Sequence, residues 1–248
     1  MRAQVIDRAG FDDLLAGSRV LRSGAAGPKV WLRDDGLVIK LLRAKPWLSS
    51  ATLRPYALRA AANARRLHER GFSSPEVTHW YRIAGERRHV IAYPLLPGRT
   101  LREIAAAGAL AGRLPALAAL FARLHAAGVY YRSGHLGNVI EMPDGELGLI
   151  DVADVRFFAR RLNARRRARS FRILLAEAAA AEAIAAAGSG VFRDDYERTL
   201  ADPSARSRAR FRRDFDRYWR AVRPDPDPGP GPGPASHAPA RRARDSAR

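Results

Sequence analysis

Three polar residues, two at the ends of apolar, strand-like segments and one after a polar loop, have side chains that could do chemistry. Lys40 ends the apolar run 37–39, and a buried lysine is costly unless it meets an anion. Asp151 ends a second apolar run, 147–150, and Asn138 lies thirteen residues before it, after a polar loop. Because Asn138 and Asp151 stand at the two ends of an expected β-hairpin, their oxygens can converge on one metal ion, and Lys40 can meet nucleotide phosphates. Phosphoryl transfer needs these parts, since it depends mostly on positioning and charge neutralisation.

The elements that must position these residues change along the chain. In the first ninety or so residues the pattern predicts strands with one helix, and beyond Gly98 it predicts mainly helices. We expect strands at 18–21, 29–33, 37–42, 77–83 and 89–94, with a helix at 55–70. We then expect helices at 100–107 and 114–127, a hairpin of 139–142 with 147–150, and helical segments at 162–187 and 193–222. The sequence therefore predicts an α+β, bilobal chain with a β-rich N-lobe and a helical C-lobe.

The expected domain covers residues 1–222, with the N-lobe at about 1–96 and the C-lobe at about 97–222. Residues 223–248 include alternating proline and glycine and end in a small basic segment. Alternating Pro and Gly can build neither a helix nor a sheet ladder. We therefore expect a disordered tail after the domain.

The composition excludes several classes of protein. The chain has 248 residues, a net charge of +19 and 47% hydrophobic residues, which excludes a fully disordered chain and predicts attraction to polyanions. The absence of cysteine excludes disulfides, thiolate metal sites and a cysteine nucleophile. We find neither a signal peptide nor an apolar run long enough to span a bilayer. We expect a cytoplasmic protein, with any membrane contact at the inner membrane peripheral.

Four motifs carry a family resemblance over residues 18–175. Lys40 lies where a kinase strand-three lysine lies, and residues 93–101 (YPLLPGRTL) match a hinge and the following helix start. Residues 131–138 (YRSGHLGN) match the catalytic loop, and Ile150-Asp151 matches the metal-binding strand end. The chain thus resembles the protein-kinase-like fold, and within it the bacterial lipopolysaccharide kinase group, including small proteins often labelled toluene tolerance proteins. Residues 135–138 are similar to the H-x-G-N of lipopolysaccharide and aminoglycoside kinases.

The resemblance implies an ATP-dependent phosphotransferase that uses Mg²⁺. It implies that Asn138 and Asp151 hold the metal and that Lys40 steadies the α- and β-phosphates. Ser133, His135 and Asp151 form the candidate catalytic set, although a structural or phosphate-side role is favoured for His135. The implied acceptor is a cell-envelope sugar or glycolipid at the cytoplasmic face of the inner membrane.

Two departures from the family pattern leave alternatives open. Ser133 stands where the catalytic loop has an aspartate, and Ala60 stands where a helix glutamate would pair with Lys40. These residues favour a nucleotide- or lipid-binding pseudokinase with a regulatory role. A second alternative is a basic nucleic-acid-binding protein, which is less favoured because no helix-turn-helix, zinc or RNA-stacking motif accompanies the charge.

An arginine-rich run follows Asp151. Its arginines are Arg156, Arg160, Arg161, Arg165, Arg166, Arg167, Arg169 and Arg172, with no acidic residue between the first and the last. One interpretation is a set of solvated helix faces. The functional interpretation is that this run, and Arg165 to Arg167 in particular, binds an anionic glycolipid, a phosphorylated saccharide or a membrane surface.

Overall fold

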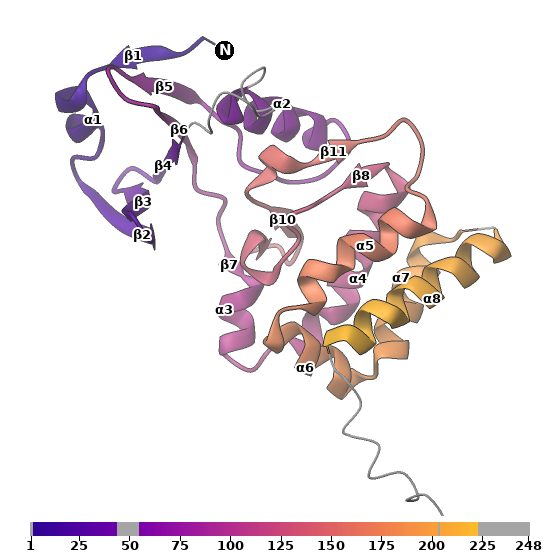
Figure 1. Ribbon diagram of the computed structural model, residues 1–248. Helices are drawn as coiled ribbons and strands as arrows, with labels where there is room; N and C mark the ends of the chain where they lie inside the picture. Colours follow the sequence, from indigo (N-terminus) through magenta and orange to yellow (C-terminus); the bar gives the residue numbers. More distant parts are fainter. Residues whose placement is uncertain (1, 44–54, 203, 223–248) are drawn as a thin grey trace, which may run out of the picture.

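The structure is a computed structural model that describes residues 2–43, 55–202 and 204–222 (Figure 1). Its strands are β1 (Gln4–Ile6), β2 (Ser18–Gly24), β3 (Gly27–Arg33), β4 (Leu37–Arg43), β5 (His79–Ile83), β6 (Arg88–Pro94), β7 (Arg99–Thr100), β8 (Val129–Tyr130), β9 (Val139–Glu141), β10 (Leu147–Leu149) and β11 (Arg156–Phe157). Its α-helices are α1 (Arg8–Leu14), α2 (Tyr56–His68), α3 (Leu101–Ala106), α4 (Leu114–Ala126), α5 (Ala164–Leu175), α6 (Ala178–Ala187), α7 (Ser189–Leu200) and α8 (Ala205–Val222). Short 3₁₀ helices are η1 (Ala111–Arg113), η2 (Leu136–Asn138) and η3 (Val152–Asp154).

The first lobe is a six-stranded sheet in the order β1-β5-β6-β4-β3-β2. β1 and β5 run parallel, and the other neighbouring strands run antiparallel. β4 lies inside the sheet, where Lys40 pairs with Val30 on one side and Ile91 on the other. Side chains alternate along a strand, so Ile39 packs with Phe11 on one face while Lys40 points to the other face, beside α2.

The expectation of one helix in the first ninety residues is wrong, because α1 precedes the first long strand. The Asp7 side chain caps this helix by accepting a hydrogen bond from the Gly10 backbone at 2.8 Å, as an N-cap residue does. Phe11 is 2% exposed and is the one residue of α1 that is buried. A seven-residue helix with a single buried side chain has too little periodicity for its pattern to be recognised.

A short connector after β6 joins the sheet to the helical lobe. Gly98 in this connector has φ +124°, and a Cβ there would overlap the carbonyl of Glu141 in β9. Only glycine allows both the backbone conformation and this close approach. Thr100 and Glu103 then form a capping box that starts α3. The connector is thereby fixed against the hairpin that carries Asn138 and Asp151.

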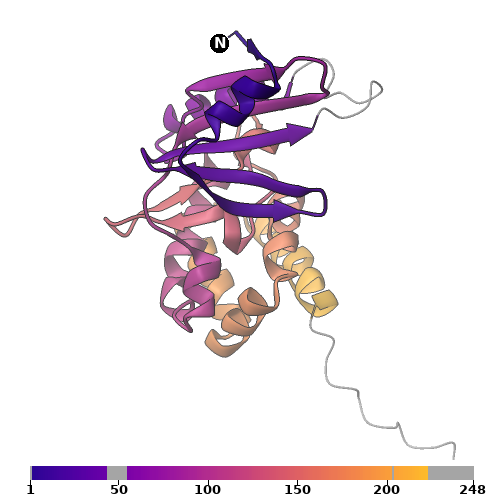
Figure 2. The ribbon, with the colours of Figure 1, turned by 90° about the vertical axis from the view of Figure 1, so that its left-hand side faces the viewer.

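The second lobe is built mainly of helices around one apolar core, and Figure 2 shows these helices below the strands of the sheet. α4 packs against α7, and α5 packs against α8. Phe171 of α5 lies at the centre, with its ring 4.8 Å from that of Phe121 and 5.1 Å from that of Tyr196. Among the described helices, none has the length and apolarity needed to cross a membrane.

The predicted α+β, two-lobed organisation is confirmed. Each expected strand and helix within the described residues is present, with ends shifted by a few positions. Both expected helical segments are divided: 162–187 is α5 and α6, and 193–222 is covered by α7 and α8. The exact domain limits, 1–222 with lobes meeting near residue 96, stay a prediction. The expected tail at 223–248 lies outside the described residues.

Candidate active site

The β9–β10 hairpin brings two predicted site residues to one place. Asn138 directly precedes β9, and Asp151 follows β10 after Ile150. The Ile150 backbone N–H donates to the Asn138 carbonyl at 3.0 Å. The Tyr131 hydroxyl lies 2.5 Å from the Ile150 carbonyl and 3.1 Å from the Asn138 carbonyl. Burial raises the pKa of Tyr131 well above its ordinary value, so this phenol stays a donor that ties the two strand ends together.

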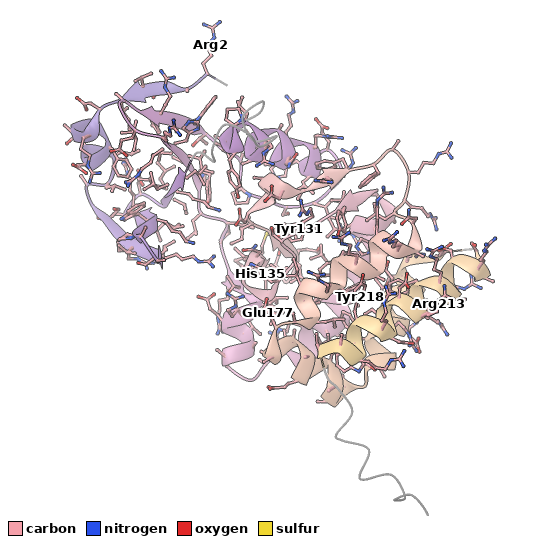
Figure 3. All side chains as sticks on the ribbon, viewed as in Figure 1. Arg2, Tyr131, His135, Glu177, Arg213 and Tyr218 are labelled. Atoms are coloured by element: carbon pink, nitrogen blue, oxygen red, sulfur yellow. The ribbon has the colours of Figure 1, made fainter. Side chains whose placement is uncertain are left out.

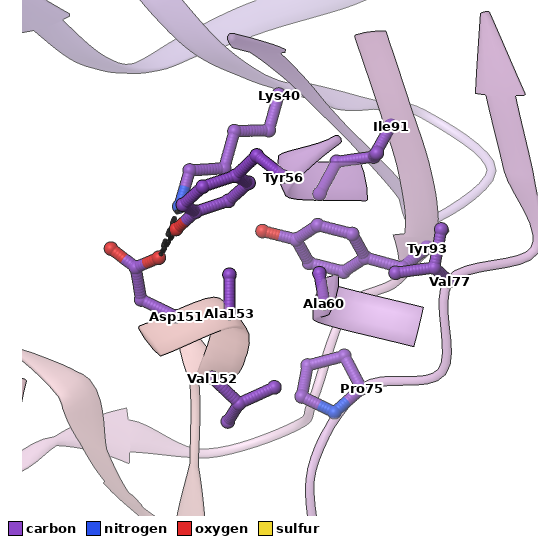
Figure 4. Close-up of a pocket in the computed structure, with 10 residues that line it drawn as sticks. All are labelled: Lys40, Tyr56, Ala60, Pro75, Val77, Ile91, Tyr93, Asp151, Val152 and Ala153. Atoms are coloured by element: carbon purple, nitrogen blue, oxygen red, sulfur yellow. Dashed lines mark hydrogen bonds and ion pairs between the residues drawn. The ribbon is translucent and has the colours of Figure 1, made fainter. Parts of the chain in front are cut away.

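Asp151 meets Lys40 across the two lobes. Its carboxylate Oδ1 is 2.9 Å from the Lys40 Nζ (Figure 4). Asp151 has a left-handed backbone conformation, φ 58° and ψ 50°, which costs a residue other than glycine about 1–2 kcal/mol. Such strain tends to occur at functional sites. The structure therefore brings the sequence-predicted lysine and aspartate together in one ion pair.

Tyr56 of α2 shares the same carboxylate oxygen. Its hydroxyl donates to Asp151 Oδ1, and in Figure 4 the second carboxylate oxygen points away from both Tyr56 and Lys40. Burial and the negative charge of Asp151 raise the pKa of Tyr56, so the phenol stays protonated. Burial opposes the charged form of Asp151, but the Lys40 ammonium and the Tyr56 hydrogen bond outweigh it and lower the pKa of Asp151. Sequence reasoning missed Tyr56.

Helix α2 is held against η3 by polar contacts. The Asn63 amide donates to the carbonyls of Val152 and Ala153 at 2.9 and 3.1 Å, and Arg59 Nη1 is 3.1 Å from Asp154 Oδ1. The cavity behind the Lys40–Asp151 pair, lined in part by Ala60, has a volume of about 20 Å³, roughly the room of one water molecule. Tight packing therefore fixes the tyrosine that contacts Asp151.

Ser133 and Asn138 are joined within the catalytic-loop segment. Asn138 is 2% exposed, and its side-chain N–H donates to the Ser133 carbonyl at 3.0 Å. Among the described residues, no group donates to the Asn138 side-chain oxygen. That oxygen is therefore available as a ligand, while the Ser133 backbone has a fixed place beside it.

His135 is held by helices of the second lobe, as Figure 3 shows beside Glu177. Its Nδ1 is 3.4 Å from Arg102 Nη2 and 3.7 Å from Glu177 Oε1. The same Glu177 oxygen accepts the Leu136 backbone N–H at 2.9 Å. Burial lowers the pKa of His135, although Glu177 opposes this. These contacts anchor the loop to α3 and α6; a catalytic role for His135 stays a prediction.

A second residue that sequence reasoning missed is Arg22 in β2. The strand has register shifts on both sides of Arg22, and an irregularity of this kind re-aims side chains. Its positive charge adds to the lowering of the pKa of both Asp151 and His135. The first lobe thus contributes a second cation, after Lys40, near the metal-binding candidates. The register irregularity at this arginine has no signal in the sequence.

The donor set fits magnesium. Mg²⁺ prefers oxygen ligands and is bound in nucleotide sites by one or two carboxylates together with phosphates and water. Asp151 supplies a carboxylate that is ionised at neutral pH, and Asn138 supplies a free amide oxygen. Within the part of the chain that the structure describes, no group of three or more histidines and carboxylates forms a metal cage. Asp151 and Asn138 are thus the residues of this site that could hold such an ion.

The arginine-rich run does not present one continuous surface. Arg167 is 1% exposed, and its Nη2 is 2.7 Å from both Asp202 Oδ2 and Ser207 Oγ. The expectation that Arg165 to Arg167 together bind an anionic surface is therefore wrong for Arg167. The reason is helical geometry: position 167 faces the core side of α5, and a buried arginine needs a carboxylate partner.

The architecture of this chain is similar to that of solved structures. The chain is similar to a solved aminoglycoside-3'-phosphotransferase of type VIII, with 19% identity and a TM-score of 0.57, covering 85% of this chain and 97% of that one. Two structures of WbdD, one with a kinase inhibitor, have 17% and 16% identity and TM-scores of 0.43 and 0.44. They cover 71% and 77% of this chain but 44% and 45% of theirs, so the chain spans less than half of WbdD.

No protein-family model matches the chain, and no curated protein matches it. The first structural likeness shows the fold. This chain has the protein-kinase-like fold, with a mixed six-stranded sheet in the first lobe and helices in the second. The Lys40–Asp151 contact lies between those lobes.

Proposed function

We propose that this protein is an ATP-dependent phosphotransferase that phosphorylates a hydroxyl of a cell-envelope sugar or glycolipid. The observation that carries the proposal is the Lys40–Asp151 contact at 2.9 Å, beside the free side-chain oxygen of Asn138, in a protein-kinase-like fold. The resemblance of residues 135–138 to lipopolysaccharide and aminoglycoside kinases supports a sugar acceptor. The similar solved structure is itself named for phosphoryl transfer to an aminoglycoside.

In this proposal the chain binds Mg-ATP between its lobes. Asp151 and Asn138 would hold Mg²⁺, which supplies charge neutralisation at the phosphates when it is bound. Lys40 would steady the α- and β-phosphates, and Arg22 would add positive charge. The acceptor hydroxyl oxygen forms a bond to the γ-phosphorus while the bond from that phosphorus to the β-bridging oxygen breaks. ADP leaves, and the hydroxyl proton passes to solvent.

The catalytic loop offers no carboxylate to take that proton. Ser133 can exchange a hydrogen bond with the acceptor hydroxyl, but a serine cannot act as a carboxylate base at neutral pH. General-base assistance contributes about 10² to 10⁴ in rate, whereas positioning and charge neutralisation contribute more to phosphoryl transfer. The proposed enzyme is therefore slow rather than inactive.

The test is thermal unfolding with and without Mg-ATP. Binding to the folded state should raise the melting temperature of the wild type, and Asp151→Asn should remove most of that rise because it removes the anionic metal ligand. Asp144→Asn, in the turn of the same hairpin, is the matched control and should respond as wild type does. If wild type and Asp151→Asn melt identically with and without Mg-ATP, the nucleotide site is wrong.

A pseudokinase that binds nucleotide or lipid and regulates a partner is the second candidate. Ser133 at the aspartate position favours it, as does the replacement of the usual lysine–glutamate pair by the Lys40–Asp151–Tyr56 cluster. Binding of Mg-ATP is common to both candidates. Turnover separates them, because a pseudokinase would bind without transferring phosphate.

The proposed place of action is the cytoplasmic face of the inner membrane. The chain carries a net charge of +19, and each basic residue close to an anionic leaflet contributes about 1 kcal/mol. Charge alone is therefore enough to support peripheral contact with a membrane that contains the glycolipid acceptor.

A further inference from the structure

A second cavity opens beside the catalytic-loop segment. Its volume is about 180 Å³, enough for a small polar group together with several waters. The lining residues that matter are Arg132 and Ser133 from the loop, Asp154 from η3, and Arg169, Arg172 and Ile173 from α5. Residues 169, 172 and 173 share one helical face because they are three and four positions apart.

The cavity carries an excess of unpaired positive charge. Within the described residues, the guanidinium groups of Arg132, Arg169 and Arg172 make no hydrogen bond and no ion pair. The one carboxylate in the lining, Asp154, is already paired with Arg59 at 3.1 Å. The buried Arg167 of the same helix, by contrast, has its carboxylate, Asp202, at 2.7 Å. Three arginines around one concavity are thus left without an anion.

The cavity also adjoins the proposed site of transfer. Ser133 borders it, and the Ser133 carbonyl accepts the Asn138 side-chain N–H at 3.0 Å. Asp154 lies three residues after Asp151, at the end of η3. A molecule seated in this cavity would therefore lie beside the loop that carries Ser133 and Asn138, and next to η3, which follows Asp151.

Charge and donor geometry select the ligand class. A phosphate monoester carries about −1.5 to −2 charge and three acceptor oxygens, and planar guanidinium groups bind such oxygens in pairs. Aminoglycosides carry several amino groups that are protonated at neutral pH, so three unpaired arginines repel them. The cavity is therefore suited to an anionic acceptor, unlike the substrate for which the similar solved structure is named.

We infer that the acceptor already carries a phosphate monoester, which Arg132, Arg169 and Arg172 bind while a different hydroxyl of the acceptor faces the Ser133 loop. This inference rests on the proposed function and narrows its substrate class. It also places the reaction after a step that leaves a phosphate monoester on the acceptor, by phosphoryl transfer, phosphorolysis or cleavage of a phosphodiester.

The test measures binding of glucose 6-phosphate to the full-length protein by calorimetry in the absence of ATP. The cavity variant is Arg169→Gln with Arg172→Gln. The matched control is Arg210→Gln with Arg213→Gln, which removes the same charge from two exposed arginines of α8 outside the cavity. Wild type and control should bind equally and should ignore glucose. The cavity variant should bind at least about tenfold more weakly, the loss expected for one charge-assisted hydrogen bond.

Equal binding of glucose 6-phosphate by wild type and the cavity variant would overturn the inference. Binding of the aminoglycoside kanamycin more tightly than glucose 6-phosphate would also overturn it. The Mg-ATP melting shift is measured on the same three proteins and should be unchanged among them. That second readout separates the two proposals. If the Mg-ATP melting shift is present but glucose 6-phosphate binding does not depend on the cavity arginines, the inference alone is wrong. If wild type shows no Mg-ATP melting shift, the proposed function is wrong.

Vesicles distinguish a lipid headgroup from a free sugar phosphate. Phosphatidylcholine vesicles with phosphatidic acid present a phosphate monoester, and those with phosphatidylglycerol present a diester. Sedimentation with the first kind only, reduced in the cavity variant, identifies a headgroup as the source of the phosphate. Cavity-dependent binding of glucose 6-phosphate without vesicle binding identifies a soluble saccharide. If neither ligand depends on the cavity arginines, or if duplex DNA displaces both from the wild type, the inference is wrong.

Discussion

The carboxylate of Asp151 is shared by two side-chain donors in the candidate site. One of its oxygens accepts from both Lys40 and Tyr56, while the other is turned away from them (Figure 4). A metal ion held by this carboxylate, as proposed, would compete with the Tyr56 hydroxyl for its negative charge. Removing the Tyr56 hydroxyl should therefore make the Asp151 carboxylate a stronger metal ligand. Neither of the proposed metal ligands, Asp151 and Asn138, is lost by that change.

Tyr56→Phe should tighten Mg-ATP binding. The substitution removes one hydrogen bond to an ionised group, worth about 1.5–3 kcal/mol, and leaves the ring packed near Lys40. We expect the dissociation constant of Mg-ATP, measured by calorimetry, to fall by about threefold to tenfold, less than the full bond energy because water replaces the phenol. Tyr93→Phe is the control, since Tyr93 lines the same small cavity. Weaker binding by Tyr56→Phe than by Tyr93→Phe would mean that the phenol belongs to the nucleotide site.

Ser133→Asp should raise the rate of phosphate transfer. Under the proposed function, the substitution introduces a carboxylate at the loop position that the resemblance assigns to the kinase base, and such a base is worth about 10² to 10⁴ in rate. Because the Ser133 carbonyl is fixed by Asn138, the new side chain should start from an ordered backbone. Transfer of labelled γ-phosphate under single-turnover conditions measures the effect. The absence of transfer in both proteins, with Mg-ATP bound, would favour the pseudokinase.

At the scale of elements, a buried polar cluster joins three helices of the second lobe. The Ser170 hydroxyl of α5 donates to the Arg167 carbonyl at 2.8 Å, so its oxygen is free to accept from His125 Nε2 of α4 at 2.7 Å. The other ring nitrogen, Nδ1, then accepts from the Tyr196 hydroxyl of α7 at 2.8 Å. This arrangement holds His125 neutral. Burial, together with the positive charge of Arg167, lowers the pKa of His125 to about 3.

The helical lobe should therefore lose stability as the pH falls. In the unfolded chain His125 has its ordinary pKa of 6.5, so below that pH the unfolded state takes up a proton that the folded state refuses. The contribution is complete above pH 6.5 and is lost as the pH falls toward 3, with a slope approaching about 1.4 kcal/mol per pH unit. Urea unfolding of wild type and His125→Gln at about pH 7 and about pH 5 measures it. At about pH 7, His125→Gln should have a lower free energy of unfolding than wild type. Between about pH 7 and about pH 5, that free energy should fall less in the variant than in wild type. An equal loss in both proteins would contradict this account.

At the scale of the whole molecule, local pattern predicts the elements and the ordered motifs but not the contacts between elements. The places of Lys40, Asn138 and Asp151 in the fold could be predicted because each follows a recognisable strand or loop, while their roles stay predictions. Tyr56 could not, because its role depends on how α2 packs against η3. The His125 cluster also depends on tertiary packing, since its partners lie 45 and 71 residues away in the chain. Contacts across such separations leave no periodic signal in a single sequence.

The central claim concerns both lobes: we propose that Mg-ATP binds between them and donates its γ-phosphate to an envelope acceptor. The most direct measurement is to incubate the protein with γ-labelled ATP and total envelope glycolipid and to follow the label. The account predicts label in the glycolipid or saccharide fraction with wild type, and at least about a hundredfold less with Asp151→Asn, in line with the loss of a group that stabilises the transition state. Label that stays entirely in ATP with wild type, although Mg-ATP binding is demonstrated in the same preparation, would contradict it.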